Sequence, residues 1–124
     1  MRRYIVPVTT AADGTATVFS PGISGKIHSI HYVKAGADAY ADGVDFTITA
    51  EITGENIWTE NNVNASAVRY PRAATHNQAG AAALYAAGGV GVLDRIALGA
   101  DRVKIALAQG GNAKTGTFHI LVER

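Results

Sequence analysis

The 124-residue sequence contains no cysteine, which excludes disulfide bonds and thiolate chemistry. No apolar run approaches the roughly 18 residues that a transmembrane helix needs. The start, MRRYIVPVTT, also lacks the apolar core of a signal peptide. We therefore expect a chain that is made in the cytoplasm, stays soluble and does not enter a membrane.

Charge is scarce as well. Charged residues make up 17% of the chain, and 11 basic residues against 10 acidic ones leave a formal net charge of +1. Apart from the neighbours Arg2 and Arg3, the basic residues are scattered. Binding to DNA or RNA usually needs a basic stripe that neutralises phosphates, so we expect no direct nucleic-acid binding. A chain of 124 residues with 48% apolar residues should fold into one domain, residues 1–124. Because charged residues are few, its surface should be rich in small polar residues.

Motifs for catalysis and for cofactors are missing. The sequence has no GxSxG elbow and no phosphate-binding GxxxxGK[ST] loop. The four histidines are His28, His31, His76 and His119. On a strand, the HSIH spacing sends the first two to opposite faces, and cupin-like metal chemistry would need histidines clustered with a carboxylate. We therefore predict that the protein is not an enzyme and holds no cofactor and no transition metal.

The segment DAYADGVD superficially resembles a calcium loop, because Asp38, Asp42 and Asp45 lie close together in it. An EF-hand counted from Asp38 would place Tyr40 and Thr49 at positions that need oxygen ligands with carboxylate or amide chemistry, so that motif fails. We interpret the segment as an Asx-rich turn and leave a looser calcium site open.

Hydrophobic periodicity indicates strands throughout. In the run 44–52, Phe46, Ile48, Ala50 and Ile52 share one face and polar residues share the other, which is the period of a half-buried strand. Eight further runs are β-rich: 3–8, 14–20, 25–34, 57–60, 65–70, 90–98, 101–109 and 117–123. Short strands separated by Gly, Asn and Asp predict an all-β fold, an antiparallel β-sandwich of eight or nine short strands, jelly-roll or immunoglobulin-like. Alternation is imperfect in 25–34, where we expect burial on both faces or a β-bulge.

One long segment interrupts this pattern. Residues 69–91, RYPRAATHNQAGAAALYAAGGVG, hold eight alanines and four glycines in 23 positions. We predict a loop or arm, with one helical turn over AAALYAA ended by Gly88-Gly89, that packs against a neighbouring subunit or against a larger assembly to which the protein binds. The alternative is a loop folded back over an open end of its own sandwich. The candidate interface residues are Tyr70, Arg72, Leu84, Tyr85 and Trp58.

Four stretches, GVDFTIT, NVNASAVRYPRAATH, AALYAAGG and DRVKIALAQGGNAKTGTFHILVE, resemble small virion structural proteins of tailed bacteriophages and prophages. Among these, capsid decoration or cement proteins are often small β-sandwiches, some of them jelly rolls, that assemble as dimers or trimers on the head shell. The resemblance implies a structural subunit of the virion, made in the host cytoplasm, whose partners are the major capsid protein or other virion proteins. It carries over no active-site residue.

Two other functions remain open. A neck or tail protein would share the same pattern, because the resemblance does not distinguish head from tail. A receptor- or carbohydrate-binding β-sandwich would use Trp58, Tyr70 and the DAYADGVD loop as a sugar site.

Overall fold

The computed structural model describes all 124 residues and contains strands but no helix. The all-β class predicted from the sequence is confirmed. The strands are β1 (Arg2–Thr9), β2 (Ala16–Phe19), β3 (Ile23–Lys34), β4 (Asp45–Ala50), β5 (Asn56–Glu60), β6 (Ala67–Arg69), β7 (Arg72–Ala74), β8 (Leu93–Arg95), β9 (Ala97–Asp101), β10 (Val103–Ala108) and β11 (Thr115–Glu123). Accordingly, no helix has the length and apolarity that a membrane crossing requires.

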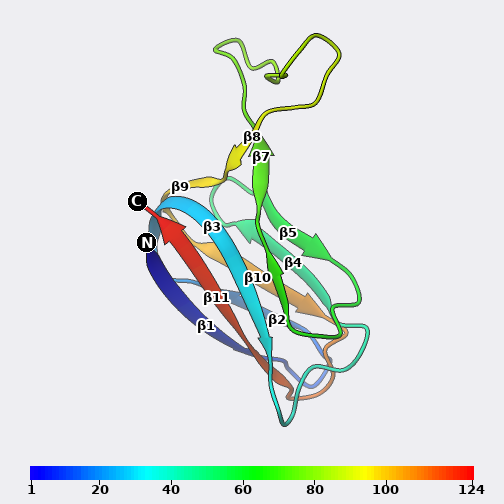
Figure 1. The fold of residues 1–124 in the computed structure, drawn as a ribbon. Helices are drawn as coiled ribbons and strands as arrows, with labels where there is room; N and C mark the ends of the chain where they lie inside the picture. The colour runs from blue at the N-terminus through cyan, green and yellow to red at the C-terminus, as the bar shows by residue number, and fades with distance from the viewer.

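Two antiparallel sheets form a sandwich. The first has the order β1-β11-β3-β6, with β9 paired to the beginning of β3, and the second has the order β2-β10-β4-β5 (Figure 1). The strands β7 and β8 pair only with each other and form a separate ribbon. A single core of 22 buried residues fills the sandwich.

The core follows the alternation read from the sequence. The predicted inward residues of three strands are buried: Phe46, Ile48 and Ala50 on β4, Val103, Ile105 and Leu107 on β10, and Phe118, Ile120 and Val122 on β11. Ile52 was expected on the same face of β4, and this prediction is wrong. The strand ends at Ala50, whose carbonyl accepts a turn hydrogen bond from Gly54, so Ile52 lies exposed in the turn.

The irregular run 25–34 contains the predicted β-bulge. Along β3, Ile27 lies opposite Val122 of β11, whereas Ser29 lies opposite the preceding residue, Leu121. His28 is therefore an extra residue without a partner of its own in the ladder. The extra residue shifts the alternation, and both Ile27 and Ile30 consequently reach the same core.

The strand count and the local structure of two runs differ from the prediction. There are eleven strands rather than eight or nine, because the run 90–98 divides into β8 and β9 at Ile96, and a new strand, β7, follows Pro71. The helical turn expected over AAALYAA is absent. A seven-residue run is too short to sustain a helix by itself, and its backbone forms hairpin hydrogen bonds instead.

Candidate functional site

The most distinctive feature of the molecule is an arm, residues 70–95, that projects beyond one end of the sandwich (Figure 1). Its stem is the ribbon of β7 and β8, in which Arg72 pairs with Arg95 and Ala74 with Leu93. Its head comprises residues 75–92. Nearly every side chain from 76 to 90 is exposed, so the head is not folded back over the sandwich.

The head has internal order although it has no core of its own. In a first hairpin, the Asn77 backbone N–H donates to the Ala81 carbonyl at 2.8 Å, and the Asn77 side-chain oxygen accepts from the Ala81 N–H at 3.0 Å. In a second, the Tyr85 N–H donates to the Val90 carbonyl at 3.0 Å. Ala83 lies between the hairpins. Its backbone N–H donates to the Thr75 carbonyl, and its carbonyl accepts from the Val92 N–H. Local hydrogen bonds thus hold the head in one shape.

Polar contacts fix the stem to the sandwich. Lys26 Nζ of β3 lies 3.3 Å from Asp94 Oδ2 of β8, and Arg95 Nη1 lies 2.9 Å from Glu123 Oε2 of β11. The backbone N–H of Arg95 above all, and then Lys26, lower the pKa of Asp94. Each exposed ion pair contributes little stability. Together, however, the two pairs tie β8 of the stem to two different strands of the sandwich, β3 and β11, and so orient the stem.

The root of the arm packs on the β-bulge of β3. The Tyr70 ring lies edge-on to the His28 ring, with centroids 5.8 Å apart, and Pro71 is buried beside it. Arg72 Nη1 donates to the His28 carbonyl at 3.1 Å. The extra residue of the bulge therefore supplies both a ring and a carbonyl on which the arm is seated.

The arm carries a surface of exposed large apolar side chains, which we call the arm surface: Tyr70, Leu84, Tyr85, Val90 and Leu93. Tyr85 and Val90 are each 77% exposed. Residues 75–92 contain no Asp, Glu, Lys or Arg. The head therefore carries exposed apolar side chains but no Asp, Glu, Lys or Arg.

Three of the five predicted interface residues, Tyr70, Leu84 and Tyr85, lie on the arm surface. Arg72 is on the arm but its guanidinium bonds the carbonyls of His28 and Pro71, so it holds the stem in place.

Trp58 was predicted as an interface residue, and this prediction is wrong. The side chain is only 5% exposed and packs edge-on to Phe46, with ring centroids 5.3 Å apart. Its Nε1 donates to Glu60 Oε1 at 3.0 Å, and Arg69 lies over its ring at 5.6 Å. Arg69 also bonds both carboxylate oxygens of Glu60, at 2.8 and 2.9 Å, and lowers its pKa. Trp58 thus helps to join the edge strands β5 and β6 of the two sheets.

Sequence reasoning missed two members of the arm surface, Val90 and Leu93. The run 90–98 was interpreted as one strand, but only its last three residues, from Ile96 onward, belong to the sandwich. Gly91 and the weak alternation of VGVLD were the available signals, since a half-buried strand should alternate.

The acidic loop brings no cluster of carboxylates together. Asp38 Oδ1 lies 3.8 Å from Lys114 Nζ, and Asp45 Oδ1 accepts from the Asn62 backbone N–H at 3.1 Å. Asp42 is exposed. No group of three His, Cys, Asp or Glu residues is placed to hold a metal ion.

Two of the four histidines are neighbours in the first sheet. His31 of β3 lies opposite His119 of β11, and Arg3 Nη1 lies 3.1 Å from His119 Nδ1. Burial above all, with smaller effects of Arg3 and His31, lowers the pKa of His119. The sequence separation of β3 and β11 concealed this pair, because only the sheet pairing places the two strands side by side.

Comparison of the chain with protein-family models, with curated proteins and with solved structures gave no match.

Proposed function

We propose that the protein is a structural subunit of a tailed-bacteriophage virion, a capsid decoration or cement protein that binds and stabilises the head shell. The observation that carries the proposal is the arm: an ordered, uncharged head with exposed apolar side chains, held away from the sandwich by a fixed stem. Such an element has no evident role inside its own domain, and it is suited to contact with another protein.

The strand order supports a jelly-roll topology for the sandwich. When β7, β8 and β9 are set aside and the remaining eight strands are numbered in sequence, the sheets have the orders 1-8-3-6 and 2-7-4-5. These are the orders of a jelly roll, in which two Greek keys wrap into facing sheets. In this arrangement the arm is an insertion between the sixth and seventh strands of the roll.

The chemistry of the arm surface indicates how binding would work. Burial of the exposed parts of Leu84 and Val90 stabilises a contact by at most about 1.5–3 kcal/mol each, since that figure holds for a side chain that starts fully exposed. Association costs offset much of that gain, so a single arm would bind weakly. Several arms acting together would bind far more tightly, and we therefore propose a dimer or trimer on the shell. The open edges of β1, β2 and β5 offer strands through which copies could also pair.

The first test is the copy number of the protein in purified particles, measured by quantitative mass spectrometry. A decoration protein should be about as abundant as the major capsid protein, since every repeated lattice position offers a site. A copy number that matches a single vertex, neck or tail ring would instead favour the neck or tail alternative and overturn the cement function.

The second test changes the arm surface. The double variant Leu84→Asp/Tyr85→Asp should fold normally but no longer bind shells that lack the wild-type protein, because burying two carboxylates opposes docking. Val33→Asp is the matched control, because Val33 on β3 has the same 46% exposure as Leu84 but lies in the sandwich. Wild-type occupancy of the double variant in a sedimentation assay would exclude the arm as the binding element.

The carbohydrate-binding alternative loses its main residue, because Trp58 is buried and unable to stack on a sugar. Glycan-array binding together with absence from purified heads would be needed to restore it.

A further inference from the structure

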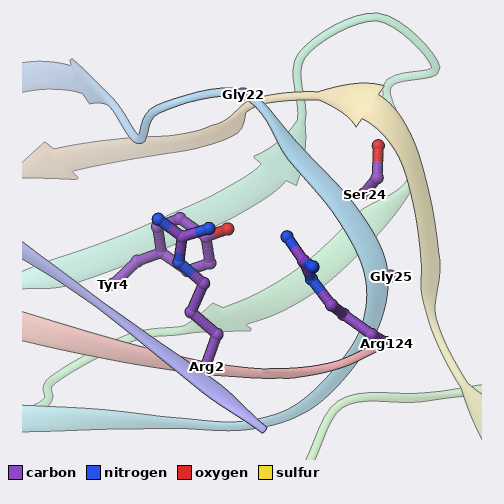
Figure 2. Close-up of a pocket in the computed structure, with 6 residues that line it drawn as sticks. All are labelled: Arg2, Tyr4, Gly22, Ser24, Gly25 and Arg124. Carbon is purple, nitrogen blue, oxygen red and sulfur yellow. The ribbon is translucent and has the colours of Figure 1, made fainter.

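A second feature, distinct from the arm, is an open pocket where the beginning of β1, the beginning of β3 and the last residue meet (Figure 2). Six residues line it: Arg2, Tyr4, Gly22, Ser24, Gly25 and Arg124. Its volume is about 500 Å³. No sequence motif marks this pocket, because its walls come from both ends of the chain and from the start of β3.

The walls of the pocket are cationic. Figure 2 shows the Arg2 side chain lying over the Tyr4 ring and the Arg124 side chain extending into the same space from the other side. The Arg2 guanidinium carbon is 5.1 Å from the Tyr4 ring centroid, a cation–π contact that limits its freedom. Neither Arg2 nor Arg124 has a side-chain carboxylate within ion-pair distance, whereas the neighbouring Glu123 is bound by Arg95. The two guanidinium groups are therefore available to an anion.

Two of the six lining residues are glycines. Gly25 has φ +141°, and a Cβ there would lie 2.4 Å from the Glu123 carbonyl oxygen, so no other residue fits. A Cβ on Gly22 would meet nothing within 4 Å. The Ser24 hydroxyl accepts a hydrogen bond from the Ala100 N–H at 2.9 Å, which leaves its own proton available to donate.

We propose that this pocket binds a dianionic phosphate group. Two guanidinium groups supply forked donors that match phosphate oxygens. The two guanidinium groups outnumber the one α-carboxylate that Arg124 itself carries, and a site of net positive charge attracts a dianion more strongly than a monoanion. The site does not depend on the arm or on its partner.

The probe is inorganic phosphate, added to the whole protein at constant ionic strength with chloride as the balancing anion. In ¹H–¹⁵N correlation spectra, the amides of Gly22, Ser24 and Gly25 should shift saturably. Methyl phosphate, also a dianion, should bind if the natural source is a phosphomonoester, and inorganic phosphate alone should bind if the source is the free ion. Dimethyl phosphate, a monoanion, should bind far more weakly. The absence of a saturable shift with both dianions, or equal affinity for dimethyl phosphate, would overturn the proposal.

Three variants test the geometry. Arg2→Gln should weaken phosphate binding about tenfold, because it removes one charge-assisted donor group. Arg3→Gln is the matched control, since Arg3 is the next residue on β1, carries the same charge and points to the other face, where it meets His119. Its effect should stay within about twofold. Gly22→Leu should abolish binding without lowering the melting temperature, because it fills the pocket and leaves every charge in place. Equal weakening by Arg2→Gln and Arg3→Gln would show that phosphate responds only to the general surface charge. Wild-type binding by Gly22→Leu would show that phosphate does not enter the pocket. Either result would refute the site.

Discussion

Replacing the head of the arm with a short turn should leave the sandwich intact. The residues on either side of the head, Ala74 and Leu93, face each other at the end of the stem, so a two-residue Asn-Gly turn can join β7 to β8 directly. None of the 22 core residues lies in the 18-residue head, residues 75–92. We therefore expect the shortened protein to fold with a free energy of unfolding no lower than that of the full chain.

Two opposing effects set the size of the change. Shortening the connection lowers the entropy cost of closing the loop by about 2 kcal/mol, since that cost grows with the logarithm of loop length. Removing the head also removes side chains that are half-buried near the stem, of which Val92 is the largest. Half of the stabilisation of a fully buried valine is about 1 kcal/mol. The free energy of unfolding should therefore rise by about 1 kcal/mol.

Trp58 provides the assay, because it is the only tryptophan of the chain and it is buried in the core. Urea unfolding followed by its fluorescence should give a midpoint at or slightly above that of the full chain, with a similar slope. A loss of more than about 2 kcal/mol would show that the head supports the sandwich, and would refute the separation of the arm from the core. The same shortened protein should fail to bind shells under the proposed function.

Three further perturbations test the sandwich itself. Asp101→Ala should lower the free energy of unfolding by about 2 kcal/mol, because the buried Asp101 carboxylate accepts from two backbone N–H groups at 3.0 and 2.7 Å. Asp101→Asn keeps an acceptor, so it should lower the free energy of unfolding less in the same urea titration. Tyr40→Phe should lower the free energy of unfolding, measured by thermal unfolding, by about 1 kcal/mol, because the buried Tyr40 hydroxyl donates to the Val8 carbonyl at 2.6 Å. Because the pKa of His119 is lowered from 6.5, its contribution to stability is complete above pH 6.5 and is lost as the pH falls through the lowered pKa. His119→Gln should therefore flatten the decline of urea stability between pH 7 and pH 5, and an unchanged decline would assign it to other groups.

The sequence by itself determined the all-β class and most of the core. Side chains of a strand alternate between two faces, so the inward residues of β4, β10 and β11 could be identified without knowing their partners. The same rule exposed the irregularity of 25–34, which became the bulge at His28. The lack of Asp, Glu, Lys and Arg in the head, residues 75–92, could also be read from the sequence, since it is a matter of composition.

Only the tertiary structure decided which residues outside the clear strands are covered. Trp58 is buried because Phe46 and Phe118 pack on it from other strands, and no local pattern reports such neighbours. Val90 is exposed because the stem carries it away from the sheets. The pocket of Arg2 and Arg124 exists because residues from opposite ends of the chain are joined at one corner of the first sheet. Alternation along a strand is local, whereas the covering of a side chain depends on strands that are remote in sequence and paired only in the folded state.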